Sequence, residues 1–138
     1  KQYKRVTPTK FIWGDTDKLP KNSANIADSS LAGQQVFVFK DQSDGFAGKA
    51  PVGSFKINKS GVYDLVGNVS EWVHDLYSFR TPPSDKSQLN YMGASNGTSH
   101  IYKGGNYKTG KISELRASYK ETSEKAEPTI GFRIARYN

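Results

Sequence analysis

The chain of 138 residues contains no cysteine, one methionine and two histidines. Without cysteine there can be no disulfide bond, thiolate metal site or cysteine nucleophile within these residues. No apolar run approaches the roughly 20 residues that a transmembrane helix needs, and no signal-peptide pattern is visible in this sequence. The two histidines are too few for a three-histidine iron site. These absences exclude several kinds of chemistry and leave the redox compartment undetermined.

The residues that are present form a polar and basic composition. Charged residues make up 24%, aromatic residues 12%, and the formal net charge is +7. The aromatic content is typical of a folded domain and not of a disordered chain, and the length fits one domain. Lysine and arginine are interleaved with acidic residues, so no basic stripe of the nucleic-acid-binding kind is present. We therefore expect one domain, with no specific nucleic-acid binding and no membrane span in this fragment.

Local patterns predict little regular secondary structure. The best strand-like run in the first half is QVFVFK at residues 35–40. The glycine- and proline-rich residues 41–55 predict a long shaped loop, and residues 80–98 predict another. A further strand is expected to begin at Glu71. Three segments of alternating apolar and polar residues predict a small antiparallel sheet in the C-terminal third. These segments are residues 101–107, 115–119 and 130–136.

The stretch GVYDLVGNVSEW at residues 61–72 follows neither a helical nor a strand period. It carries the carboxylates of Asp64 and Glu71, and Gly67 and Asn68 bend the chain so that backbone carbonyls are exposed. Hard divalent cations prefer such a set of carboxylate and carbonyl oxygens. The stretch therefore indicates a calcium loop. The alternative is that Asp64 caps a turn and Glu71 pairs with a surface lysine.

Seven motifs follow one another from about Phe11 to Arg136: WGD, ANIAD, DGFAGKAPVGSF, NKSGVYDLVGNVSEW, YKGGNY, LRAS and GFRIAR. In this order they resemble the formylglycine-generating enzyme family, also called sulfatase-modifying factor domains. The resemblance implies an α+β, C-type-lectin-like fold with little regular secondary structure, short antiparallel strands and long loops held by calcium. Family members extend further upstream. We therefore expect residues 1–138 to form one such domain that lacks its N-terminal portion.

The resemblance also implies two calcium sites, each made of two side chains and two backbone carbonyls, so that one or two Ca²⁺ ions are expected. The first site comprises the side chains of Asn25 and Asp44 and the carbonyls of Ile26 and Phe46. The second comprises the side chains of Asp64 and Glu71 and the carbonyls of Gly67 and Val69. Arg116 and Arg133, in the LRAS and GFR motifs, are expected to be buried or partly buried and to pair with carboxylates or loop carbonyls.

The catalytic chemistry of the family is not expected here. The oxidising enzymes of the family hold copper(I) with two cysteines, and a soft ion of this kind needs thiolate ligands. The first cysteine position corresponds to Thr109, and the second falls between Lys111 and Glu114. Asn106 replaces the active-site serine, and Ser70 replaces the tryptophan of the GNVWEW motif. We therefore expect no copper and no formylglycine formation by that mechanism.

The sequence thus predicts a non-catalytic, calcium-stabilised binding or assembly module with a protein or peptide partner. Bacterial relatives, including variable proteins diversified by retroelements, also use this scaffold without the copper chemistry. The alternative is a divergent oxidase, or an accessory domain of a non-heme iron enzyme whose metal ligands lie outside this fragment. Calcium is abundant outside the cytoplasm, which favours an extracytoplasmic location. The expected ligand surface lies where the enzymes bind substrate, at Ser70, Asn106, Tyr107, Lys108 and Thr109.

Overall fold

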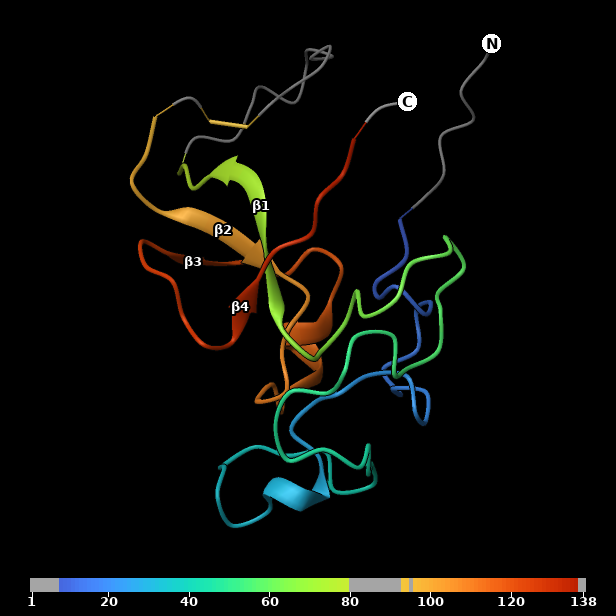
Figure 1. Ribbon diagram of the computed structural model, residues 1–138. Coiled ribbons are helices and arrows are strands. Elements are labelled where there is room, and N and C mark those ends of the chain that lie inside the picture. The colour runs from blue at the N-terminus through green and yellow to red at the C-terminus, as the bar shows by residue number, and fades with distance from the viewer. Residues whose placement is uncertain (1–7, 80–92, 95, 137–138) are drawn as a thin grey trace, which may run out of the picture.

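The computed structural model describes residues 8–79, 93–94 and 96–136 (Figure 1). Its regular elements are two 3-10 helices and four short strands, and no α-helix occurs among the described residues. The 3-10 helices are η1 (Ser29–Leu31) and η2 (Ile112–Leu115). The strands are β1 (Ser70–Leu76), β2 (His100–Lys103), β3 (Glu121–Ser123) and β4 (Ile130–Gly131). The predicted predominance of loops is confirmed.

The four strands form one sheet in the order β3-β2-β1-β4. Strand β1 lies between β2 and β4 (Figure 1). It pairs antiparallel with β2, where Trp72 lies opposite Tyr102, and parallel with β4, where Glu71 lies opposite Gly131. The sheet is therefore mixed and not purely antiparallel as predicted. A parallel pair needs a crossover connection, and here the chain leaves β1, builds β2 and β3 on one side, and returns to the other side as β4.

Residues 35–40 do not form the predicted strand. Only isolated bridges involve this region, Ala32 with Gln35 and Asp28 with Phe39. Val36 is 91% exposed, whereas Phe39 packs against the core. Alternation of apolar and polar residues predicts a strand only if a neighbouring strand supplies hydrogen bonds, and none lies beside this run. Residues 41–55 form the predicted long loop.

The C-terminal segments are shorter than predicted. Residues 115–119 form no strand, because η2 ends at Leu115 and an irregular turn follows it. Among the described residues 130–136, strand pairing is limited to Ile130 and Gly131, and Phe132 and Ile134 are exposed. The central strand begins at Ser70, one residue before the predicted start. The predicted loop at 80–98 lies largely outside the described residues.

The main hydrophobic cluster lies under the loops, and Ile101 of β2 is a buried apolar side chain outside it. The cluster contains Phe11, Leu19, Ala24, Ile26, Val66 and Leu115, and Trp13, Phe39 and Ile112 pack against it. The rings of Phe11 and Trp13 stack at a centroid distance of 4.5 Å. Burial of such side chains contributes about 1.5–3 kcal/mol each. The loops between residues 11 and 67 are therefore held by their own apolar side chains together with Leu115 and Ile112 of η2.

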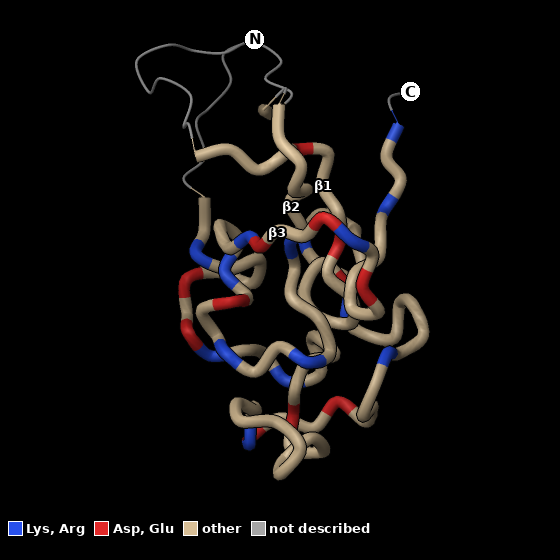
Figure 2. The backbone as a smooth tube through the Cα atoms, turned by 90° about the vertical axis from the view of Figure 1, so that its left-hand side faces the viewer, with Lys and Arg blue, Asp and Glu red and all other residues tan. Residues whose placement is uncertain are grey.

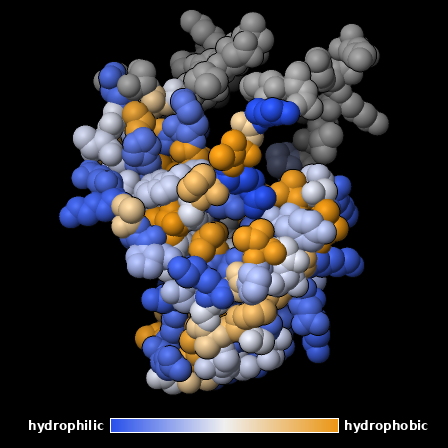
Figure 3. All heavy atoms as spheres, in the orientation of Figure 1, coloured by the Kyte–Doolittle hydropathy of each residue, from blue (hydrophilic) through white to orange (hydrophobic). Residues whose placement is uncertain are grey.

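The surface is mixed in charge and hydropathy. Lysine and arginine alternate with aspartate and glutamate along the described chain (Figure 2). On the face shown in Figure 3, apolar side chains are interspersed with hydrophilic ones. None of the helices in the described ranges is long and apolar enough to cross a membrane.

Candidate functional site

Asn25 is fully buried, between the core residues Ala24 and Ile26. Its side-chain Nδ2 donates hydrogen bonds to the backbone oxygen of Gly48 (2.8 Å) and to Oδ1 of Asn68 (3.2 Å). Because a carbonyl oxygen can only accept, the bond to Gly48 fixes the orientation of the Asn25 amide. Its Oδ1 atom is buried and has no hydrogen-bond partner. Buried acceptors without a donor are rare and costly, so this atom fits a positively charged ligand.

The carboxylate of Asp44 lies against the residue that follows Asn25. Its Oδ2 accepts a hydrogen bond from the backbone N–H of Ile26, and its Oδ1 accepts one from that of Phe46, both at 2.9 Å. The four residues of the first predicted calcium site are therefore brought together. Burial raises the pKa of Asp44 above its ordinary value; the two backbone N–H groups oppose this shift, and the negative charge of Asp28 adds to it. A carboxylate with a raised pKa gains from a nearby cation.

Asp28 is a second carboxylate beside this site, more deeply buried than Asp44, and the sequence analysis did not single it out. It is fully buried and accepts hydrogen bonds from the N–H and hydroxyl of Ser30 and from the backbone N–H of Asp44. Burial raises the pKa of Asp28, but these hydrogen bonds outweigh burial and lower it overall. Asp28 therefore stays ionised. Asp28 is the N-cap of η1, and an aspartate directly before the first helical residues is a capping signal that could have located it.

The bend at Gly67 and Asn68 packs directly onto the first site. Gly67 has a φ of 78°, and a Cβ atom there would lie 2.2 Å from the backbone oxygen of Asn25. Asn68 donates its backbone N–H to the same oxygen at 2.7 Å. The side chain of Asn68 exchanges two hydrogen bonds with the backbone of Ala50. The two predicted calcium loops thus share one buried polar junction.

The second predicted site contains a charged partner from the C-terminal segment. Arg133 donates from Nη2 to Glu71 Oε1 (2.6 Å) and from Nε to Glu71 Oε2 (3.0 Å). Its Nη2 also donates to the backbone oxygen of Tyr63 at 2.9 Å. The hydrogen bond to Glu71 raises the pKa of Arg133, burial opposes this, and the charges of Glu71 and Asp64 raise it further. Asp64, at a φ of 52°, accepts the backbone N–H of Gly53 at 2.7 Å.

The structure tests the predictions that Arg116 and Arg133 are buried or partly buried and pair with carboxylates or loop carbonyls. Arg133 pairs with a carboxylate and a loop carbonyl as predicted, but it is more exposed than predicted, with 39% of its side chain accessible. Arg116 is exposed and not buried. The surface partner of Glu71 is therefore an arginine, where the local alternative named a lysine.

Three residues of the predicted ligand surface hold a turn in place. Ser70 and Thr109 are buried, with exposed fractions of 1% and 7%. Asn106 donates its side-chain Nδ2 to the Ser70 hydroxyl (3.1 Å), and its backbone N–H to the Thr109 hydroxyl (3.0 Å). Lys108 is exposed, and its ammonium lies 5.6 Å from the ring centroid of Tyr107. Of the five residues, Lys108 is exposed, Tyr107 and Asn106 are half-buried, and Ser70 and Thr109 are buried.

A neighbouring loop extends this surface. Lys111 places its ammonium 4.3 Å from the ring centroid of Phe37, and Phe37 is 54% exposed. The loops touch closely, since a Cβ atom on Gly110 would lie 1.9 Å from the backbone oxygen of Phe37. We call Phe37, Tyr107, Lys108 and Lys111 the basic-aromatic surface. Sequence reasoning missed Phe37 and Lys111, because the contact joins residues far apart in the chain.

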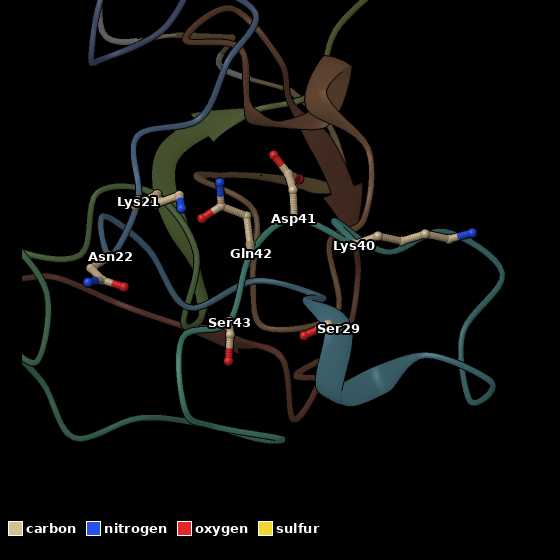
Figure 4. A pocket seen from close by; sticks show the side chains of 7 residues that line it. All are labelled: Lys21, Asn22, Ser29, Lys40, Asp41, Gln42 and Ser43. Carbon is tan, nitrogen blue, oxygen red and sulfur yellow. The ribbon is translucent and has the colours of Figure 1, made fainter.

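A cavity of about 370 Å³ lies beside η1. It is lined by Lys21, Asn22, Ser29, Lys40, Asp41, Gln42 and Ser43 (Figure 4). All of these except Gln42 are exposed, so the cavity is an open surface depression. Within the described ranges no three His, Cys, Asp or Glu side chains cluster closely enough to hold a metal ion. The predicted calcium sites depend largely on amide and backbone oxygens, so this observation does not bear on them.

Solved structures of known proteins share this fold. The structure is similar to variable protein 1 of Treponema denticola, with a TM-score of 0.60 and 21% identity over 80% of this chain and 34% of that chain. It is also similar to PvdO from Pseudomonas aeruginosa, with a TM-score of 0.58 and 27% identity over 80% of this chain and 38% of that chain. The predicted fold is confirmed: it is the C-type-lectin-like fold of formylglycine-generating enzymes.

The family follows from the sequence profile. The profile of the sulfatase-modifying factor enzyme 1-like domain matches residues 6–138. The mouse (Mus musculus) formylglycine-generating enzyme is 35% identical over 96 residues, which cover 67% of this chain and 25% of the enzyme. The chain belongs to the family of sulfatase-modifying factor enzyme 1-like domains. It matches about a quarter of the length of this curated relative.

Proposed function

We propose that the domain is a non-catalytic, calcium-stabilised binding or assembly module built on the scaffold of the formylglycine-generating enzymes. The observation that carries the calcium part is the buried, unpartnered Oδ1 of Asn25 next to the residues that hold Asp44. Asn25, Asp44, Ile26 and Phe46 would supply side-chain and carbonyl oxygens. Water would complete the roughly six to eight oxygen ligands of calcium.

Calcium would supply positive charge where the fold concentrates negative charge. Asp44 and Asp28 are close enough for the charge of Asp28 to raise the pKa of Asp44. A divalent cation beside Asp44 would offset this repulsion and satisfy the Asn25 oxygen at once. The loops that carry these residues are then fixed on the core through Ile26, which lies between them and the apolar cluster.

The chemistry at the family's copper position supports a non-catalytic role. Thr109 stands where the resemblance places the first cysteine, and its buried hydroxyl accepts the backbone N–H of Asn106. A hydroxyl already engaged in this way is a poor ligand for copper(I), which prefers soft thiolates. The 138 residues contain no cysteine. The turn instead has a structural function, which is to present Tyr107 and Lys108.

The basic-aromatic surface indicates the chemistry of the partner. Aromatic side chains are enriched in protein interfaces, and charge complementarity directs association. The chain has a net charge of +7, and two lysines lie over aromatic rings on this surface. We infer a protein or peptide partner that presents acidic side chains beside apolar ones.

Metal analysis tests the calcium part. The domain is purified without chelator, its metals are measured, and thermal unfolding of metal-stripped protein is followed with and without added calcium. Free calcium at a hundred times the dissociation constant stabilises the native state by about 2.7 kcal/mol. The same melting temperature in both buffers would refute calcium stabilisation. Stoichiometric copper or iron would instead support a divergent oxidase or an accessory domain of an iron enzyme.

Peptide binding tests the surface. An array of acidic, aromatic-containing peptides is probed with the wild-type domain, with Lys108→Glu, and with Lys59→Glu as a matched change of charge on an exposed lysine of a different loop. Binding is expected to fall at least tenfold for Lys108→Glu and to change little for Lys59→Glu. Equal losses in the two variants would show that only net charge matters, and the surface assignment would then be abandoned.

A further inference from the structure

At the loop predicted to hold the second calcium, the positively charged guanidinium of Arg133 already pairs with Glu71. The guanidinium of Arg133 bonds both carboxylate oxygens of Glu71 and the backbone oxygen of Tyr63. The charge of Asp64, the other predicted side-chain ligand, contributes to the raised pKa of Arg133. The guanidinium therefore lies within the electrostatic reach of both carboxylates of the predicted site.

We propose that Arg133 takes the place of the second calcium, so that the domain binds calcium at the first site alone. The part of this inference that concerns the first site depends on the proposed function above. A guanidinium is charged at every pH a protein experiences, and its fork matches a carboxylate. A calcium ion must lie about 2.3–2.6 Å from its oxygen ligands. An ion that close to the Glu71 oxygens would lie beside the guanidinium, and the two positive charges would repel each other.

The two predicted sites also differ in how their oxygens are satisfied. At the first site, both oxygens of Asp44 accept neutral backbone N–H groups, and Oδ1 of Asn25 is buried and has no donor. At the second site, one oxygen of Asp64 accepts a backbone N–H, but both oxygens of Glu71 accept from the charged guanidinium of Arg133. A calcium ion would therefore satisfy an unpaired oxygen at the first site, but would have to displace a positively charged donor at the second.

The sheet places Arg133 at this position. Strand β4 runs parallel to β1, and Gly131 lies opposite Glu71. The strand ends at Gly131, and Arg133 follows two residues later, where its guanidinium bonds the Glu71 carboxylate. The arginine of the GFR motif is thus an internal counter-ion, and its position is set by the register of the β1–β4 pair.

The number of bound calcium ions tests the inference. Calcium is counted by elemental analysis and by calorimetric titration of metal-stripped protein, for the wild type and for Arg133→Met. Methionine keeps an apolar stem and removes the charge. We expect one calcium per wild-type chain and two per Arg133→Met chain. Arg136→Met, which removes the charge of another exposed arginine of the C-terminal segment, is the matched control and should keep one.

Other outcomes separate this inference from the proposed function. Two calcium ions in the wild type, or one calcium in both the wild type and a folded Arg133→Met variant, would overturn the inference and leave calcium stabilisation intact. No calcium in either protein would overturn both. No calcium in the wild type but one in Arg133→Met would support the inference and refute the first site. If Arg133→Met does not fold, the calcium affinity of Glu71→Gln tests the inference instead. It should bind calcium with wild-type affinity, and a tenfold weaker affinity would show that Glu71 is a ligand.

Discussion

The first and second predicted calcium sites begin from similar sequence patterns and have different surroundings in the fold. Each offers two side chains with oxygen atoms and two backbone carbonyls near a bend. In the first, a buried amide oxygen of Asn25 lacks a donor. In the second, Arg133 arrives from the C-terminal segment and forms a two-pronged ion pair with Glu71. A sequence pattern therefore predicts where candidate ligand oxygens lie close together. Residues distant in the chain determine whether those oxygens can bind calcium or already bind a guanidinium.

The largest effect is expected at the junction that both loops share. Gly67→Ala places a Cβ atom 2.2 Å from the backbone oxygen of Asn25, at a φ of 78°. The backbone must move, and we expect a loss of about 4 kcal/mol or more in the free energy of unfolding. Denaturant unfolding of Gly67→Ala and of the wild type measures it.

Gly33→Ala is the control for that measurement. Gly33 also has a positive φ, 84°, but a Cβ atom there meets nothing within 4 Å. Its substitution should lower the free energy of unfolding by about 1 kcal/mol, because only the strained backbone conformation is affected. Equal losses in the two variants would contradict the close approach of Gly67 to Asn25 and, with it, the coupling of the two loops.

The next largest effect separates the two loops directly. Asp44→Asn should abolish the stabilisation by calcium, which amounts to about 2.7 kcal/mol at a hundredfold excess over the dissociation constant. Such a change corresponds to roughly 8 °C in melting temperature for a domain of this size. Glu71→Gln should keep the calcium-dependent difference. Melting curves with and without calcium measure both, and the opposite result would place calcium in the second loop.

The calcium effect should also depend on pH. The pKa of Asp44 is raised in the folded state. Without calcium, the ionised carboxylate therefore destabilises the folded state, and this destabilisation is relieved as the pH falls through that pKa. With calcium bound, protons compete with the ion, and stability is lost over the same range. The difference in melting temperature between calcium-loaded and metal-stripped protein should therefore shrink between pH 7 and pH 4. A constant difference would exclude Asp44 as a ligand.

The smallest effect concerns the ion pair of the second loop. Its side chains are partly exposed, at 39% for Arg133 and 22% for Glu71, and exposed pairs contribute about 0.2–1 kcal/mol. A double-mutant cycle with Arg133→Met and Glu71→Gln should give a coupling energy near the upper end of this range, and 1 M salt should reduce it. A coupling energy of zero would mean that the arginine does not hold the loop.

The sequence predicted the fold class and the bend at Gly67 and Asn68, since both depend on local residues or on the order of family motifs. It did not predict the contacts between distant loops. The partner of Glu71 lies 62 positions away in the chain, and Asn25 meets Asn68 across 43 positions. The strand expected at residues 35–40 failed for a related reason: a strand requires a neighbour, and local alternation cannot say whether one will be present.

The parallel pairing of β1 with β4 has a consequence for how the chain folds. The central strand finds its partners only after long loops have closed, because Ser70 pairs with Ile130 and Glu71 with Lys103. The entropy of closing such loops is lost before the strand contacts compensate for it, and proteins dominated by distant pairings fold in about milliseconds to seconds. The apolar cluster around Phe11 and Ile26 also needs a distant residue, Leu115. We therefore expect refolding to be slow.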